Sequence, residues 1–135
     1  VREGEDWQLY NVERTVSANN TADVHISLRW ESTTSDKGCF FMSVPDHRSY
    51  RAMEPVASHW QSHNALGESL VKGLKEKGNT IFSSGAMAMD LTQTSFSTVP
   101  SVDIELGDKA SDHSSATLAT LADGLVAGVN QYFGQ

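Results

Sequence analysis

The segment ADVHISLRWES, residues 22–32, has the clearest β-strand pattern in the chain. Apolar and polar side chains alternate strictly along it, and this period of two residues is typical of a strand with one buried face. The apolar positions are Val24, Ile26, Leu28 and Trp30. Because strands with a single apolar face are typical of antiparallel sheets covered on one side, we expect the polar side chains of this strand to face solvent.

Further segments extend this pattern in both directions along the chain. Strands are expected at residues 7–17, 39–44, 80–92 and 96–106. A long helix is expected from Pro55 to Gly78 and a second at residues 114–133, since apolar residues recur there every three or four positions. The order βββαββα predicts an α+β fold, with an antiparallel-dominated sheet of about five strands and two helices packed on one face in a two-layer α/β sandwich.

Two details refine the expected sheet. The small residues Ser83, Ser84 and Gly85 predict a bulge or bend in the strand at 80–92. Pro100 lacks an N–H group, which favours an edge position for the strand at 96–106. The exposed side of that strand would carry Asp103 and Glu105. One parallel pair of strands is expected if the long helix acts as a crossover.

The bulk composition is that of one globular domain spanning residues 1–135, with a polar, frayed end at residues 1–6. The net charge is −7, and the only clustered cations, at Lys72, Lys75 and Lys77, alternate with acidic residues. Nucleic-acid binding is therefore not expected, because such proteins concentrate Lys and Arg on one face. No apolar run is long enough to span a bilayer.

His59 and His63 are the one histidine pair at helical i, i+4 spacing, and they are the candidates for a metal site. A helical wheel places His63 among the core residues of the long helix and His59 at the edge of its apolar side. A zinc site needs further ligands on that buried side, and the sequence offers no obvious one. We therefore expect a structural, hydrogen-bonded pair, with His63 making the fold sensitive to acid, and we assign no metal and no cofactor.

Enzyme motifs are absent from the sequence, and no catalytic residue is assigned. There is no G-x-S-x-G element, no phosphate-binding glycine loop and no calcium-loop spacing. The dipeptides Asp46-His47 and Asp112-His113 leave one enzymatic alternative open. This is a small hydrolase that uses a loop histidine and a carboxylate around residues 45–54 and 107–113.

The final helix carries small residues beside its apolar side, at Thr117, Gly124 and Gly128. Small residues let a second backbone approach closely. The favoured interpretation is packing against the long helix, which has its own Gly67 and Gly73. The alternative is an interaction surface for a protein partner or for a second copy of the chain.

Two features favour a secreted, processed protein. The chain begins without Met, and Asn19 lies in a glycosylation sequon expected at a turn formed by residues 18–20. The single cysteine, Cys39, excludes an intrachain disulfide and is expected to be a buried thiol.

The leading hypothesis from the sequence is therefore a secreted, non-enzymatic protein that acts by surface binding, as a toxin, an effector or a binding module directed at a protein or cell-surface partner. By analogy of fold alone, comparable architectures occur among secreted fungal killer toxins and effectors. The alternatives are the loop-histidine hydrolase and a subunit of a larger assembly released from a precursor.

Overall fold

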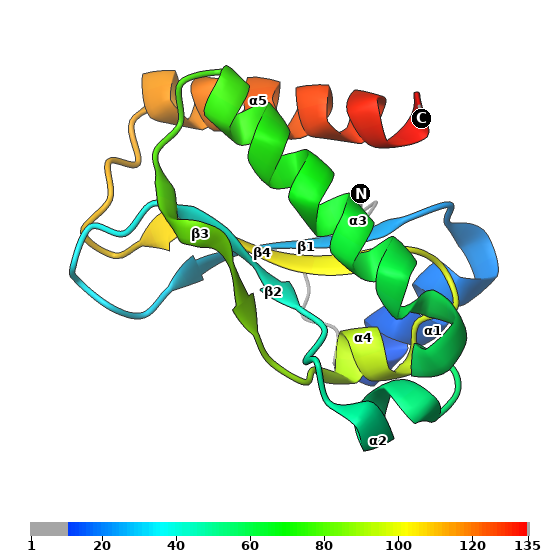
Figure 1. The fold of residues 1–135 in the computed structure, drawn as a ribbon. Helices are drawn as coiled ribbons and strands as arrows, with labels where there is room; N and C mark the ends of the chain where they lie inside the picture. The colour runs from blue at the N-terminus through cyan, green and yellow to red at the C-terminus, as the bar shows by residue number, and fades with distance from the viewer. Residues whose placement is uncertain (1–10, 135) are drawn as a thin grey trace.

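The computed structural model describes residues 11–134 of the 135-residue chain (Figure 1). Its elements, in chain order, are α1 (Asn11–Thr21), β1 (His25–Glu31), β2 (Cys39–Ser43), α2 (Arg48–Ala52), α3 (Val56–Glu76), β3 (Ile81–Ala88), α4 (Thr92–Phe96), β4 (Ser101–Asp108) and α5 (Ser115–Phe133). None of the helices within residues 11–134 is long and apolar enough to cross a membrane.

The four strands form one mixed sheet in the order β1-β4-β2-β3. The outer pairs, β1 with β4 and β2 with β3, are parallel, and only the central pair, β2 with β4, is antiparallel. The α+β class and the two-layer sandwich are confirmed, whereas the antiparallel-dominated sheet of about five strands is wrong. The sheet is mixed because two of its strand pairs are joined through crossover connections, which parallel pairs require. The helix α3 returns the chain from β2 to the parallel strand β3, and the long segment from β2 to α4 separates β1 from its parallel neighbour β4.

The segment expected as a first strand, residues 7–17, is helical over the part that the structure describes; residues 7–10 and the frayed end at 1–6 lie outside it. In α1 the buried residues are Thr15 and Ala18, three positions apart. The Thr15 hydroxyl donates to the backbone oxygen of Asn11, four residues earlier, at 2.9 Å, a bond that is typical of a helical turn. Helical rather than alternating burial explains why the strand prediction failed here.

The segment expected as a strand at 96–106 begins instead with Phe96, the last residue of α4, and β4 starts only at Ser101, after Pro100. Pro100 therefore lies before the strand and does not interrupt its pairing. Because β4 occupies a central position in the sheet, the predicted edge position is wrong. A central strand has a hydrogen-bonded neighbour along each edge. Asp103 and Glu105, which were expected to face solvent, are only 2% and 6% exposed.

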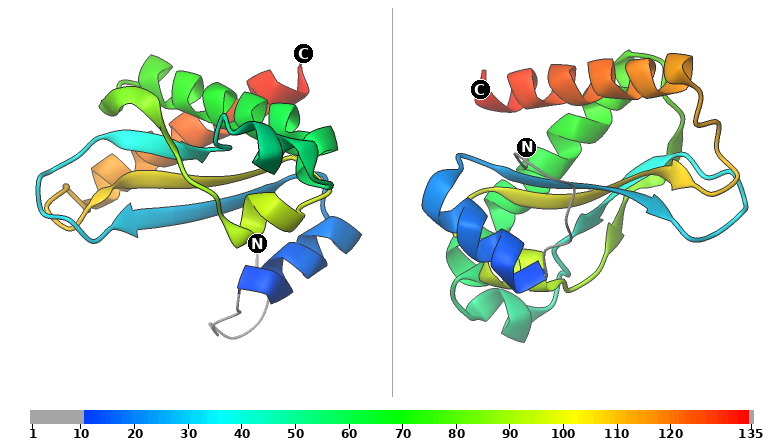
Figure 2. Two further views of the ribbon diagram at one scale, coloured as in Figure 1. Left: turned by 60° about the horizontal axis from the view of Figure 1, so that its bottom comes forward. Right: turned by 180° about the vertical axis from the view of Figure 1, so that it is seen from behind.

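The helix layer matches the expectation of two helices on one side of the sheet (Figures 1 and 2). The core brings residues of α3, such as Leu66 and Leu70, onto apolar side chains of β4, such as Val102 and Ile104. The final helix, α5, crosses over α3 (Figure 2). Its first turn is capped as expected, since the Ser114 side chain accepts a hydrogen bond from the backbone N–H of Thr117.

The contact between the two long helices depends on glycines. A Cβ atom built on Gly73 would lie 2.4 Å from the backbone oxygen of Gly124, and one built on Gly128 would lie 2.6 Å from Cα of Leu70. Gly67, by contrast, faces the Phe41 ring. The small side of α5 is therefore packed inside the molecule against α3.

The expected irregularity in β3 is present. Its pairing with β2 shifts register between Cys39↔Ile81 and Phe41↔Ala86. Within the bulge, Ser83 has φ of 52° and Gly85 has φ of 87°, a conformation that glycine adopts without steric cost.

Candidate functional site

The polar face of the β1–β4 pair gathers ionisable side chains. The two strands run parallel in the register Ser27↔Asp103 and Arg29↔Glu105. Because successive side chains of a strand point to opposite faces, Val102 and Ile104 join the helix-covered core, and the two acidic residues of β4 point to the other face. Parallel register thus places Arg29 beside both carboxylates.

An ion pair joins the two strands at this point. Nε of Arg29 lies 2.9 Å from Oδ2 of Asp103, with 45% of the arginine side chain and 3% of the aspartate side chain exposed. The other oxygen, Oδ1 of Asp103, is buried and has no hydrogen-bond partner. Burial raises the pKa of the Asp103 carboxyl, while the positive charges of Arg29 and Arg14 act in the opposite direction.

Glu105 is the most perturbed acid of the face. Burial, and then the negative charge of Asp103, raise its pKa to about 7, against the opposing charge of Arg29. Its Oε2 atom is buried without a hydrogen-bond partner. Leaving a buried carboxylate oxygen unpaired costs stability, and such costs concentrate at functional sites. A carboxyl group with a pKa near 7 gains and loses protons at neutral pH, which is the property of a general acid or base.

Neighbouring polar contacts fix the two strands around this pair. The amide of Gln93, on α4, donates to Oγ of Ser101 at 2.8 Å and to the backbone oxygen of Val102 at 2.9 Å. Its Oε1 atom accepts the hydroxyl of Ser27 at 2.7 Å. At the far end of β1, Lys37 pairs with Glu31 at 2.7 Å. The acidic pair is thus buried and bracketed by fixed polar groups, whereas the Arg29 side chain beside it is partly exposed.

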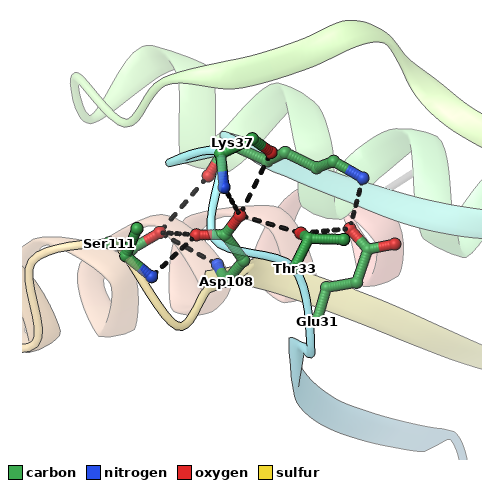
Figure 3. A network of polar contacts seen from close by, with 7 residues as sticks. Glu31, Thr33, Lys37, Asp108 and Ser111 are labelled. Atoms are coloured by element: carbon green, nitrogen blue, oxygen red, sulfur yellow. Dashed lines mark hydrogen bonds and ion pairs between the residues drawn. The ribbon is translucent and has the colours of Figure 1, made fainter.

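The end of β4 is tied to the loop after β1 by Asp108 (Figure 3). Its Oδ2 atom accepts the Thr33 hydroxyl at 2.8 Å and the backbone N–H of Ser35 at 2.9 Å. Its Oδ1 atom accepts the backbone N–H of Ala110 at 3.0 Å. Desolvation acts to raise the pKa of Asp108, but the bonds from Thr33 and from backbone N–H groups outweigh it and hold that pKa at about 2. Asp108 is therefore an ionised structural anchor.

Substituting Asp108→Ala is expected to release the loop over residues 32–38, because the variant has no acceptor for the Ser35 amide. Hydrogen exchange measured by NMR should then show a faster Ser35 amide, with the amides of α3 unchanged. Thr34→Ala, at an exposed position in the same loop, is the matched control. Unchanged exchange at Ser35 in Asp108→Ala would contradict the anchoring role.

His63 lies in the core, as the helical wheel predicted, with 1% of its surface exposed. Its Nδ1 atom accepts the backbone N–H of Ser101 at 2.9 Å, and its Nε2 atom is buried without a partner. The His59 ring stacks on it at a centroid distance of 6.3 Å and bonds through Nδ1 to the backbone oxygen of Pro55. Within residues 11–134 no three His, Cys, Asp or Glu side chains come together to hold a metal ion.

Acidification is expected to destabilise the fold through His63. Burial, and secondarily the charge of His59, lower the pKa of His63 from 6.5 to about 4. Between those two values the unfolded chain binds the proton and the folded chain does not, so stability is lost as the pH falls from 6.5 to 4, by about 3 kcal/mol. Urea unfolding at pH 7.5 and 4.5 should show this loss in the natural chain and not in His63→Asn, whose amide can still accept the Ser101 N–H.

His47→Asn, at an exposed position, is the control for that measurement and is expected to follow the natural chain. An identical dependence of stability on pH in the His63→Asn variant would show that His63 does not cause the acid sensitivity.

The loop histidines do not form the acid–base pairs that the sequence left open. His47 bonds through Nδ1 to the hydroxyl of Ser49, and His113 bonds through Nε2 to the backbone oxygen of Asp108. The His113 ring also contacts Trp30 edge-on, with centroids 4.3 Å apart. In the described part of the chain, neither ring hydrogen-bonds to a carboxylate, so the loops at 45–54 and 107–113 do not assemble a histidine–carboxylate site.

Asn19 lies in the last turns of α1, not in the expected turn. Its Nδ2 atom donates to the backbone oxygen of Phe96 at 3.0 Å, and its Oδ1 atom accepts the backbone N–H of Thr98 at 2.8 Å. Because a glycan is attached at Nδ2, glycosylation would weaken this contact with the α4 region. Glycosylation of Asn19 stays a prediction.

The proposed interaction surface on α5 is largely occupied. Gly124 and Gly128 are buried against α3. The Thr117 hydroxyl donates to Oδ2 of Asp112 at 2.6 Å, as part of the helix cap. A partner contact through the two glycines would need α3 to move away, and only Thr117 of the three remains partly exposed.

Comparison with known proteins identifies the fold as that of amidase catalytic domains. No family model matches the sequence, and no curated protein matches it. Among solved structures, the catalytic domain of CwlV, an N-acetylmuramoyl-L-alanine amidase from Bacillus (Paenibacillus) polymyxa var. colistinus, superimposes with a TM-score of 0.73 at 17% identity. Ami1, an N-acetylmuramyl-L-alanine amidase from Mycobacterium smegmatis, gives 0.75 at 17%, and the CwlD amidase from Clostridioides difficile, solved in complex with the GerS lipoprotein, gives 0.70 at 15%.

The match with CwlV covers 96% of this chain and 69% of the CwlV chain. The corresponding shares are 98% and 65% for Ami1, and 91% and 61% for CwlD. The chain thus spans about two thirds of the length of the amidases it resembles. These neighbours overturn the expectation of a non-enzymatic toxin, effector or binding module, because the solved structures that share this architecture are amidases. The analogy failed because helix and strand order alone did not distinguish the two kinds of protein.

Proposed function

We propose that this chain is a hydrolase of amide bonds of the N-acetylmuramoyl-L-alanine type, with Glu105 as its general base. The observation that carries the proposal is the buried, unpartnered carboxylate oxygen of Glu105, whose pKa of about 7 suits proton transfer at neutral pH. The amidase fold supports the choice of an amide substrate, since the solved neighbours are named for the bond between N-acetylmuramic acid and L-alanine.

In the proposed reaction, Oε2 of Glu105 takes a proton from a water molecule as the water oxygen attacks the amide carbonyl carbon. The C–N bond then breaks, and the same proton passes from Glu105 to the departing nitrogen. Asp103 keeps the pKa of Glu105 high through its negative charge, and Arg29 keeps Asp103 ionised. The products are a carboxylate and a free amine.

The proposed substrate also indicates where the protein acts. A bond of this type occurs in peptidoglycan, so an extracellular or periplasmic location fits the proposed activity and agrees with the secreted location expected from the sequence. The complex of CwlD with the GerS lipoprotein makes a protein partner a reasonable further proposal.

The proposal is tested by incubating the purified chain with N-acetylmuramoyl-L-alanine and measuring the released amino group of alanine by derivatisation and chromatography. Release that increases with enzyme concentration and time supports it. No release above the uncatalysed background, from a protein shown to be folded, would refute it.

A further inference from the structure

The outer side of β1 is an open edge of the sheet. In the order β1-β4-β2-β3, β1 has one neighbouring strand among residues 11–134 (Figure 2). The backbone N–H of His25 donates to the backbone oxygen of Pro100, on the β4 side, at 2.8 Å. Because successive residues of a strand direct their peptide groups to opposite sides, Ile26 and Leu28 direct theirs away from β4. Such an edge is a template for a further strand.

The apolar side of β1 is also uncovered. On the helix side of the sheet, Ile104 of β4 is fully buried, whereas its register partner Leu28 is 54% exposed. Trp30, two positions further along the same side, is 38% exposed, although its ring contacts His113. The helix layer therefore covers β4 and leaves large apolar side chains of β1 in solvent. Exposed apolar groups gathered at an open strand edge indicate a surface for protein contact.

The opposite edge of the sheet, at β3, is built differently. Its pairing with β2 is interrupted by the bulge at Ser83 and Gly85, both of which have positive φ. Bulges are one of the devices by which proteins keep strand edges from pairing with other chains. In contrast, β1 keeps a regular register with β4 from His25 to Arg29. Of the two edges, β1 is therefore the one suited to receive a strand.

We propose that β1 pairs antiparallel with β1 of a second copy of this chain, with Leu28 on the two-fold axis, so that the two sheets join into one. This register pairs all seven residues of β1, from His25 to Glu31. It places Ile26 opposite Trp30 of the second copy. Residues that lie opposite each other in antiparallel strands share one face, so the apolar side chains of both copies meet on the helix side. The pair uses the open edge of each copy, and the assembly closes at two.

The charges of β1 favour the same register. Arg29 lies opposite the neutral Ser27 of the second copy, and His25 lies opposite Glu31. A shift that puts Arg29 on the axis would set two arginines against each other, which is destabilising. A shift that puts Ser27 on the axis would set Arg29 against His25, where Arg14 already contributes positive charge. The proposed register avoids both conflicts.

Sedimentation equilibrium tests the pairing. Between about 10 and 200 µM the natural chain should approach twice the mass of one chain as its concentration rises. Leu28→Lys would bring two ammonium groups together on the axis, so this variant should remain a monomer over the same range. Val16→Lys, at a 52% exposed apolar position on α1, is the matched control and should dimerise like the natural chain. Circular dichroism checks that each variant is folded.

Cysteine cross-linking tests the register, and it also covers the case in which Leu28→Lys fails to fold. In Leu28→Cys the two new thiols face each other in a hydrogen-bonded pair, where Cα atoms lie about 5.5 Å apart and a disulfide can form. In Trp30→Cys the two thiols lie four residues apart along the strands, roughly 13 Å, which is too far. The natural Cys39 is buried. Mild oxidation should therefore give at least roughly 10-fold more disulfide-linked dimer with Leu28→Cys than with Trp30→Cys.

Three results would overturn the proposal. The first is a natural chain that stays monomeric at about 200 µM. The second is a dimer that persists in a folded Leu28→Lys variant, or that cross-links equally well through Leu28→Cys and Trp30→Cys. The third is a mass that keeps growing beyond two copies, because a two-fold pair of β1 strands closes. None of these measurements depends on amide hydrolysis, so the pairing and the proposed function are tested separately.

Discussion

Replacing Glu105 with Gln is expected to lower kcat for amide hydrolysis by roughly 10²- to 10⁴-fold, the usual contribution of a positioned general base. Glutamine has the same shape but cannot accept the proton of the attacking water. The natural enzyme should gain activity as the pH rises through about 7, where Glu105 loses its proton, and this limb of the pH–rate profile should be missing from the residual activity of Glu105→Gln. Steady-state kinetics between pH 5 and 9 provide the measurement.

The stability of the same variant separates a catalytic from a structural role. The pKa of Glu105 is raised from 4.5 to about 7, so its proton stabilises the folded chain at low pH, and that stabilisation is lost as the pH rises from 4.5 to 7. At pH 8 Glu105→Gln should therefore be more stable than the natural chain, by about 2 kcal/mol. Glu68→Gln, at an exposed position of α3, should change neither stability nor activity. A destabilised Glu105→Gln variant at pH 8 would indicate that Glu105 acts by holding the fold.

Replacing Gly128 with Val is expected to destabilise the chain by about 3 kcal/mol, at the upper end of the usual cost of overpacking. The first added carbon would lie 2.6 Å from Cα of Leu70 and 2.7 Å from the backbone oxygen of Ser69. Both are backbone atoms of α3, so relief requires the two helices to separate. Urea unfolding at pH 7.5 measures the change in the free energy of unfolding.

Ala122→Val, at an exposed position of the same helix, is the control for Gly128→Val and should cost less than about 1 kcal/mol, the penalty of helix propensity alone. Comparable losses in the two variants would show that the glycine contact between α3 and α5 is not what holds the helices together.

The long helices could be predicted from the sequence because their periodicity and end signals are local. The helix expected from Pro55 to Gly78 corresponds to α3, and Ser114 caps α5. The placement of His63 in the core also followed from the helical wheel. In contrast, the pattern of residues 11–17 is short and mixed, and burial of α1 against α4 decided its conformation.

The candidate site could not be predicted, because it depends on strand order. From the sequence, Asp103 was placed on a solvent-exposed strand face, but its side chain is buried. The position of β4 between β1 and β2 brings Arg29 of β1 beside it. One signal was available: Arg29 and Glu105 occupy the polar positions of two alternating strands and carry opposite charges. Using it required knowing that β1 and β4 are neighbours.

The central claim is that water, activated by Glu105, cleaves an amide bond on this chain. The most direct measurement is hydrolysis of N-acetylmuramoyl-L-alanine in water enriched in ¹⁸O, followed by mass spectrometry of both products. The account predicts free L-alanine without label and N-acetylmuramic acid with one ¹⁸O atom in its new carboxylate, and loss of both products with Glu105→Gln. Recovery of intact, unlabelled substrate from a folded enzyme, or product formation that Glu105→Gln leaves unchanged, would contradict it.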